Sequence, residues 1–116
     1  MKVALSIMLT SLITASSFAA PKPFEYKDGE TVLEGMVAQP KKNTHQGAAI
    51  LVVPEWNGIN PYVIKRLEQL AEMGYTAFAA DIYGKGVRPT TMEESAKTSN
   101  IYKNDRALFK RRMALA

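Results

Sequence analysis

The segment from Ala48 to Tyr62, AAILVVPEWNGINPY, constrains the fold of this chain more than any other. It begins with an unbroken apolar run, Ala48 to Val53, which is typical of a strand buried on both faces of a parallel sheet. The run ends abruptly at Pro54, Glu55 and Trp56, and a glycine turn follows. The feature to explain is therefore a carboxylate and a large aromatic side chain directly after a buried strand.

A helix is predicted after this loop, and a second buried strand after the helix. Asn60 is a good N-cap, Pro61 fits the first helical position, and apolar residues then recur at helical spacing. Gly74 suits the left-handed residue that ends a helix. The run from Tyr75 to Ile82, YTAFAADI, resembles another buried strand. Strand, helix and strand with short links form a βαβ unit, so the two strands should be parallel.

A hairpin is predicted before this unit. Phe24 to Tyr26 and Thr31 to Ala38 are the expected antiparallel strands, and the Asp-Gly pair within Lys27 to Glu30 favours a tight turn between them. The polar segment from Gln39 to Gly47 is expected to be a loop.

Helices are predicted after the unit. Thr91 and Glu94 fit a capping box for a short helix over 92–98, and the pattern is helical again from Tyr102 to Ala116. Parallel sheets need several strands and cover on both faces. The fold class is therefore α/β, and the fold is interpreted as unfinished.

The first twenty residues, MKVALSIMLTSLITASSFAA, have the pattern of a secretory signal peptide. Lys2 provides a positive start, Val3 to Ala15 is apolar and uncharged, and small residues stand at the positions that a signal peptidase reads. The predicted cut follows Ala19, so residues 1–19 are the leader and 20–116 the mature, exported chain, periplasmic or secreted. An uncleaved anchor is the alternative, but the run is short for a membrane span, so no stable membrane insertion is expected after cleavage.

Composition excludes several kinds of partner and site. The chain of 116 residues has a formal net charge of +4, which falls by one with Lys2, and no clustered basic motif indicates nucleic-acid binding. There is no cysteine, so an exported chain must be held by its core without disulfides. The sequence has no cluster of metal-ligating residues, so no metal or other cofactor is expected.

The ends of the two predicted parallel strands should meet in one cleft. Ligands of open α/β sheets bind outside the carboxyl ends of the strands. The candidates to line this cleft are Glu55, Trp56, Asp81, Tyr83 and Lys85. A nucleotide-binding domain is disfavoured, because the first turn lacks the glycine pattern that cradles phosphate and carries a carboxylate instead.

The segment VVPEWNGINPYVIKRLEQLAEMGYTAFAADIYGKG resembles the N-terminal half of the dienelactone hydrolase family, which has the α/β-hydrolase fold. The motifs that carry the resemblance are Glu55, Gly58-Ile59-Asn60, Leu70-Ala71, Gly74-Tyr75, Ala77 and Asp81-Ile82-Tyr83-Gly84, within a likeness that extends from about Thr31 to Ala116. The resemblance implies hydrolysis of a small-molecule ester or lactone by a Cys or Ser nucleophile with His and Asp, and it implies no cofactor.

The resemblance also implies roles for three residues. Glu55 matches the glutamate that hydrogen-bonds the resting nucleophile, and the backbone N–H of Trp56 matches an oxyanion-hole donor. The Trp56 side chain would wall the pocket. Lys85 lies where some members bind a substrate carboxylate through arginine, and lysine keeps the charge but loses the bidentate fork.

Structural roles are the alternatives. Glu55 could be a strand-end carboxylate paired with a lysine, and Trp56 could cap the core. Lys85 and the basic stripe from Lys103 to Arg112 could simply be solvated. For Asp81 a turn-forming role is favoured.

The residues of a triad are missing from this sequence. It contains no Gly-x-[Cys/Ser]-x-Gly and no cysteine, and its one histidine, His45, precedes the first parallel strand on a polar loop, where we expect it to be solvated. The chain alone is therefore expected not to hydrolyse esters by the family mechanism. It is interpreted as truncated, from a partial, frameshifted or split gene. The alternative function is that of an inactive fragment or binding remnant.

Overall fold

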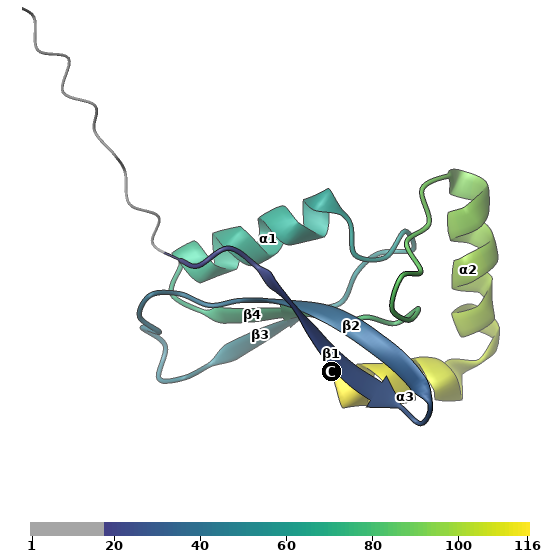
Figure 1. The fold of residues 1–116 in the computed structure, drawn as a ribbon, viewed down its shortest axis with the longest axis horizontal. Coiled ribbons are helices and arrows are strands. Elements are labelled where there is room, and N and C mark those ends of the chain that lie inside the picture. The colour runs from purple at the N-terminus through teal and green to yellow at the C-terminus, as the bar shows by residue number, and fades with distance from the viewer. Residues whose placement is uncertain (1–17) are drawn as a thin grey trace, which may run out of the picture.

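The computed structural model describes residues 18–116, which form a mixed four-stranded sheet with three helices. The elements in chain order are β1 (Lys22–Asp28), β2 (Thr31–Ala38), β3 (Ala49–Val52), α1 (Pro61–Glu72), β4 (Thr76–Ala79), α2 (Met92–Asn104) and α3 (Arg106–Leu115). The strand order is β1-β2-β4-β3 (Figure 1). The predicted α/β class is confirmed. The predicted signal peptide lies almost wholly outside the described residues and stays a prediction.

The predicted hairpin is confirmed and is longer than its pattern indicates. β1 and β2 pair antiparallel from Lys22 opposite Val37 to Asp28 opposite Thr31. Gly29 allows the tight turn, because its φ of 59° lies in the left-handed region. Most of β1 is exposed, so its residues carry little of the alternation that marks a half-buried strand.

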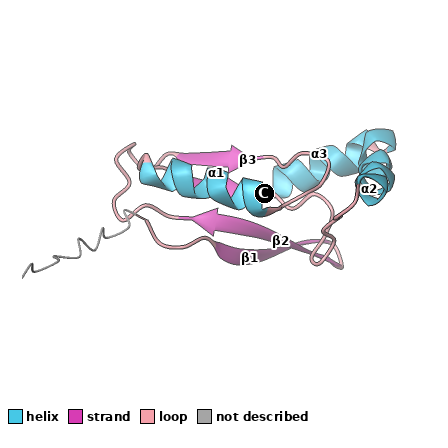
Figure 2. Cartoon of the chain, turned by 90° about the horizontal axis from the view of Figure 1, so that it is seen from above, coloured by secondary structure: helices cyan, strands magenta, loops and turns pink. Residues whose placement is uncertain are grey.

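The βαβ unit is also confirmed. β3 and β4 pair in parallel, with Ile50 opposite Ala77. The Asn60 side chain accepts the N–H of Val63 at 3.0 Å, with Pro61 at the start of α1, as predicted. Figure 2 shows α1 running alongside the sheet. The core between them contains Ala38, Ile59, Val63, Leu67, Ala71, Ala77 and Ala79.

The two parallel strands differ in detail from the prediction. β3 was expected to be buried on both faces, but it is an edge strand of the described sheet, and Leu51 and Val53 are 43% and 39% exposed. β4, expected over Tyr75 to Ile82, ends at Ala79 because the chain turns around the carboxylate of Asp81.

The C-terminal helices divide at a different point from the one predicted. The capping box of Thr91 and Glu94 is confirmed, but α2 continues to Asn104 instead of ending near Thr98. Asp105 separates the helices, since its side chain accepts the N–H of Leu108 at 2.9 Å and caps α3. α2 stands beyond the end of the sheet, and α3 leads back toward the hairpin and contacts β1 (Figure 1).

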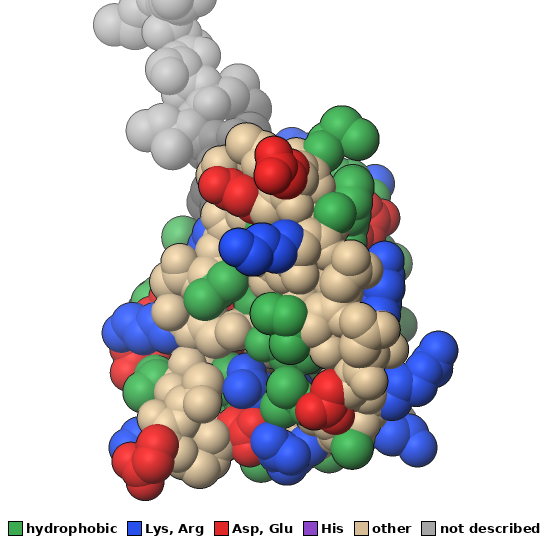
Figure 3. Space-filling model, turned by 90° about the vertical axis from the view of Figure 1, so that its right-hand side faces the viewer, with side chains coloured by type: hydrophobic (Ala, Val, Ile, Leu, Met, Phe, Trp, Pro, Cys, Tyr) green, Lys and Arg blue, Asp and Glu red, His purple; other side chains and the backbone are tan. Residues whose placement is uncertain are grey.

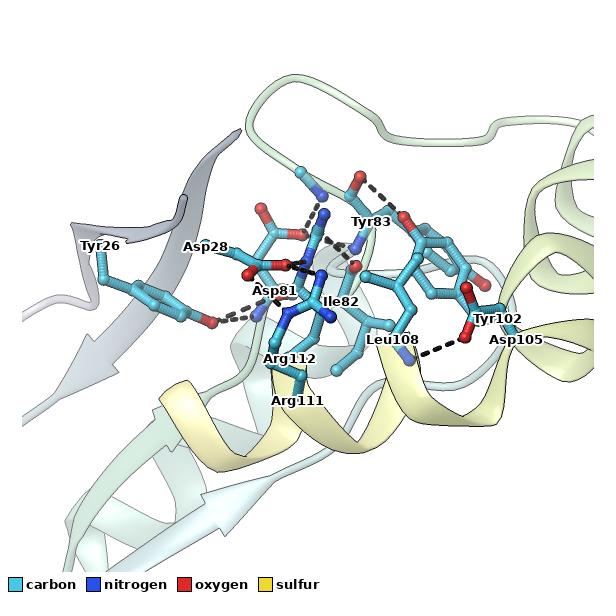
Figure 4. A network of polar contacts seen from close by, with 11 residues as sticks. Tyr26, Asp28, Asp81, Ile82, Tyr83, Tyr102, Asp105, Leu108, Arg111 and Arg112 are labelled. Atoms are coloured by element: carbon cyan, nitrogen blue, oxygen red, sulfur yellow. Dashed lines mark hydrogen bonds and ion pairs between the residues drawn. The ribbon is translucent and has the colours of Figure 1, made fainter. Parts of the chain in front are cut away.

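Paired arginines hold α3 against the hairpin (Figure 4). Arg111 binds both carboxylate oxygens of Asp28, at 2.7 and 3.0 Å, and Arg112 Nε lies 2.6 Å from Asp28 Oδ2. Arg112 also donates to the carbonyl of Ile82 at 3.0 Å and is only 6% exposed. The interpretation of Lys103 to Arg112 as a solvated stripe is therefore wrong at Arg112, because a carboxylate and a carbonyl satisfy its buried guanidinium.

Candidate functional site

A cavity of about 270 Å³ lies beyond the carboxyl ends of β3 and β4. It is bounded by the loop after β3, the chain after β4, and the facing sides of α2 and α3. Its lining residues are Pro54, Glu55, Trp56, Gly58, Ile59, Ala80, Asp81, Ile82, Tyr83, Ser99, Tyr102, Lys103, Arg106 and Phe109.

Four of the five cleft candidates, Glu55, Trp56, Asp81 and Tyr83, line this cavity, and Lys85 does not. The Lys85 ammonium instead forms an ion pair with Glu25 and lies 3.6 Å from Glu34 Oε2. Glu25 and Glu34 are opposite each other on β1 and β2, so Lys85 offsets the repulsion between two carboxylates. The hydrogen bond to Glu25 is the main reason that the pKa of Lys85 is raised. Its substrate-binding role stays a prediction.

A tight turn carries Glu55 and Trp56 to the edge of the cavity. The N–H of Gly58 donates to the carbonyl of Glu55 at 2.9 Å. Gly58 is buried with a φ of 70°, so this position needs a residue without a side chain. A residue from another part of the chain also holds the turn, because the Tyr83 hydroxyl donates to the carbonyl of Trp56 at 2.6 Å.

Glu55 and Trp56 both keep groups that could meet a ligand. Glu55 is exposed and forms no ion pair with any described residue, so the alternative of a lysine-paired carboxylate is not found. Trp56 is 40% exposed, and its backbone N–H has no acceptor among residues 18–116. A carboxylate and an unpaired N–H on adjacent residues can bind a polar group in the cavity.

Asp81 is a turn-forming residue, as favoured from the sequence. Its carboxylate accepts the N–H groups of Glu34, Tyr83 and Gly84 at 2.8, 3.1 and 3.0 Å. Arg88 Nη1 lies 3.5 Å from Asp81 Oδ1, and the residue is 2% exposed. Because these groups occupy both carboxylate oxygens, Asp81 holds the chain after β4 in place and is not a free base.

The helical side of the cavity was missed at the sequence level. It comprises Ser99, Tyr102, Lys103, Arg106 and Phe109. The Tyr102 hydroxyl donates to the carbonyl of Tyr83 at 3.2 Å, and the two rings lie 5.1 Å apart. Burial raises the pKa of both tyrosines, so both hydroxyls are protonated donors near neutral pH. A signal was present, because positions 99, 102 and 103 follow helical spacing yet are not a uniform apolar stripe.

His45 lies at the other end of β4 from the cavity. Its ring stacks on Tyr75 with centroids 3.6 Å apart, and Nε2 lies 2.9 Å from the carbonyl of Met73. His45 is half-buried, so it is solvated only in part, because an aromatic ring and a carbonyl flank it. Tyr75 precedes β4, whereas the cavity begins after β4, so His45 is not part of this site.

Within residues 18–116, no group of three or more His, Asp and Glu side chains is arranged to hold a metal ion. None of the helices in this part of the chain is long and apolar enough to cross a membrane.

Comparison with known proteins gives a consistent set of similarities. The model of the dienelactone hydrolase family matches residues 33–115. The solved structure named m3DLH is 27% identical with a TM-score of 0.73, over 84% of this chain and 42% of that chain. A dienelactone hydrolase-like promiscuous phosphotriesterase, P91, from metagenomic libraries is 26% identical with a TM-score of 0.75, over 85% of this chain and 41% of that one. This chain thus spans less than half the length of either structure. No curated protein matches it.

Proposed function

Because the chain belongs to the dienelactone hydrolase family, we propose that it forms one side of a hydrolase site that acts on ester or lactone bonds of small molecules. The observation that carries the proposal is the Glu55–Gly58 turn, which borders the cavity beyond two parallel strands. In this proposal the Trp56 N–H donates to the substrate oxygen on which negative charge develops, and Glu55 hydrogen-bonds the resting nucleophile.

The nucleophile and its activating histidine and aspartate lie outside this sequence in the proposed enzyme. The 116 residues contain no cysteine, and the one histidine, His45, is at the far end of β4. A Cys or Ser with a base and an orienting acid would complete the site. The similar structures are more than twice as long as the part matched here, which leaves room for these elements.

The alternative is a catalytically inactive fragment that binds a small molecule without turnover. The observation that favours it is the cavity itself, which has aromatic walls and polar groups although the sequence contains no triad. Binding of an ester without release of its alcohol by the purified 116-residue chain would support this alternative for the chain alone.

The test uses the complete polypeptide. This is the longer product that results if the reading frame continues past codon 116 and encodes a Gly-x-[Cys/Ser]-x-Gly, an Asp and a His. Trp56→Pro removes the N–H, and Trp56→Ala keeps it. Residue 56 is the second residue of the turn, a position where proline is favoured, so the variant should fold. We expect Trp56→Pro to lower kcat by about 10²–10³, the usual cost of one oxyanion donor.

The matched variant decides the interpretation. Trp56→Ala should change kcat much less than Trp56→Pro, because only the ring is lost. The substrates are p-nitrophenyl acetate and, because the name of P91 describes a phosphotriesterase, diethyl p-nitrophenyl phosphate. Equal effects of the two substitutions would contradict the role of the N–H. A stop at codon 116 with no such sequence nearby would favour the binding alternative.

Export is a separate part of the proposal and rests on the sequence pattern of residues 1–19. Protein recovered from the periplasm or medium should begin at Ala20 on N-terminal sequencing. Protein that keeps Met1 and stays in the cytoplasm would contradict export.

A further inference from the structure

Tyr83 joins the turn that carries Trp56 to the chain that follows β4. Its hydroxyl donates to the Trp56 carbonyl at 2.6 Å, although the two residues are 27 apart in the sequence. Its ring also lies against Gly58, where an added Cβ would be 3.3 Å from Tyr83 Cδ2. One side chain therefore contacts the turn at its second and its fourth residue.

Tyr83 is itself held by the surrounding structure. Its N–H donates to Asp81 Oδ1 at 3.1 Å, and its carbonyl accepts the Tyr102 hydroxyl at 3.2 Å. The rings of Tyr83 and Tyr102 pack at an interplanar angle of 34° (Figure 4). Since Asp81 is buried and fully bonded, Tyr83 is a fixed point from which the turn can be oriented.

The bonds on the turn determine the orientation of two peptide planes. The carbonyl of Trp56 is bound by Tyr83, and the carbonyl of Glu55, which shares a rigid planar peptide with the Trp56 N–H, is bound by Gly58. Tyr83 contacts both ends of this arrangement, because its hydroxyl binds the Trp56 carbonyl and its ring packs on Gly58, whose N–H holds the plane of the Trp56 N–H. We propose that through these two contacts Tyr83 is a positioning residue that sets the direction of the Trp56 N–H at the cavity. The purpose of this positioning rests on the proposed function, but the positioning itself can be measured without any reaction.

The test uses NMR relaxation of the ¹⁵N-labelled 116-residue chain. Trp56 is its one tryptophan, which assists assignment. We expect an order parameter of about 0.85 for the Trp56 amide in the wild type, and a fall below about 0.6 in Tyr83→Phe, which removes only the hydroxyl. Tyr102→Phe is the matched comparison, because it deletes a hydroxyl-to-backbone bond that reaches Tyr83 and not Trp56. It can act on Trp56 only through Tyr83, so it should lower the Trp56 value less than Tyr83→Phe does.

The outcomes are distinct. An unchanged Trp56 order parameter in Tyr83→Phe overturns the inference, as does an equal fall in Tyr102→Phe. If Tyr83→Phe does not fold, the order parameter of the Trp56 amide in the wild type is the test. A wild-type value below about 0.6 overturns the inference. In the complete polypeptide, Tyr83→Phe should lower kcat by up to about a hundredfold with little change in KM. Absence of turnover in the wild-type complete polypeptide would count against the proposed function and not against the positioning.

Discussion

At the scale of single residues, Asp28 connects the hairpin turn to the last helix. The hydrogen bonds from Arg111, and then those from Arg112, lower the pKa of its carboxyl group from 3.8 to about 2. A carboxyl group whose pKa is lower in the folded chain binds its proton less tightly there than in the unfolded chain. Its ion pairs therefore contribute stability in full above pH 3.8, and that contribution is lost as the pH falls through about 2.

We expect Asp28→Asn to lower the Tm near neutral pH, and the difference from the wild type to shrink as the pH falls from 3.8 to about 2. Thermal unfolding followed by circular dichroism across the acid range measures this. Glu93→Gln, a change in the first turn of α2 that leaves Asp28 and both arginines in place, is the control and should show no such convergence. A constant difference between Asp28→Asn and the wild type at all pH values would contradict the ion-pair explanation.

Gly35 is required by packing, and its replacement should be costly. An added Cβ would press on the ring of Phe78 and lie 2.6 Å from the carbonyl oxygen of Ala79 on the paired strand. Overpacking costs about 1–3 kcal/mol, and this backbone cannot move aside, so Gly35→Ala should reach about 3 kcal/mol. Gly29→Ala is the control, because its Cβ would meet nothing within 4 Å. Its cost comes only from the left-handed backbone, with a φ of 59°, and should be about 1 kcal/mol. Urea unfolding that ranks Gly29→Ala as the costlier change would contradict this.

At the scale of elements, the start of α2 depends on a reciprocal cap. The Thr91 hydroxyl accepts the N–H of Glu94 at 3.2 Å, and Glu94 Oε2 accepts the N–H groups of Thr90 and Thr91. We expect Thr91→Ala to lower the free energy of unfolding by about 1 kcal/mol, because one helix N–H loses its acceptor. Chemical denaturation measures this loss. Thr90→Ala keeps the N–H bonds and should cost less, and an equal loss would contradict the cap.

Helix starts could be predicted from the sequence because a cap is a local structure. Each cap joins residues within one helical turn: Asn60 with Val63, and Thr91 with Glu94. The break at Asp105 was missed because helical patterns stand on both sides of it. An aspartate in mid-pattern could have indicated this break, since its side chain competes for a backbone N–H and starts a new helix.

The candidate site was partly predictable for a related reason. Glu55, Trp56, Asp81 and Tyr83 follow parallel strands, and the carboxyl ends of such strands meet at one edge. Lys85 lies only two residues further, but the chain turns at Gly84, with a φ of 115°, and the Lys85 N–H donates to the carbonyl of Val32. That turn, like the return of α2 and α3 to the cavity, depends on contacts between distant segments that no short motif contains.

At the scale of the whole molecule, the distribution of exposed apolar side chains separates two kinds of surface. The α2 side, seen in Figure 3, has apolar side chains interspersed with charged ones of both signs. By contrast, Leu51 on β3 and Val53 directly after it are exposed at an edge strand of the described sheet. An apolar edge strand offers both backbone hydrogen-bonding groups and apolar area to another chain.

We therefore expect the purified 116-residue chain to self-associate through β3. Burial of a leucine side chain contributes about 1.5–3 kcal/mol, so Leu51→Lys should weaken association by about tenfold or more. Sedimentation velocity over a dilution series measures the dissociation constant. Ile101→Lys is the control, because Ile101 is more exposed than Leu51, at 55% against 43%, but lies on α2 and should have little effect. A monomeric wild type at every concentration, or equal effects of the two lysines, would show that β3 is not the associating edge.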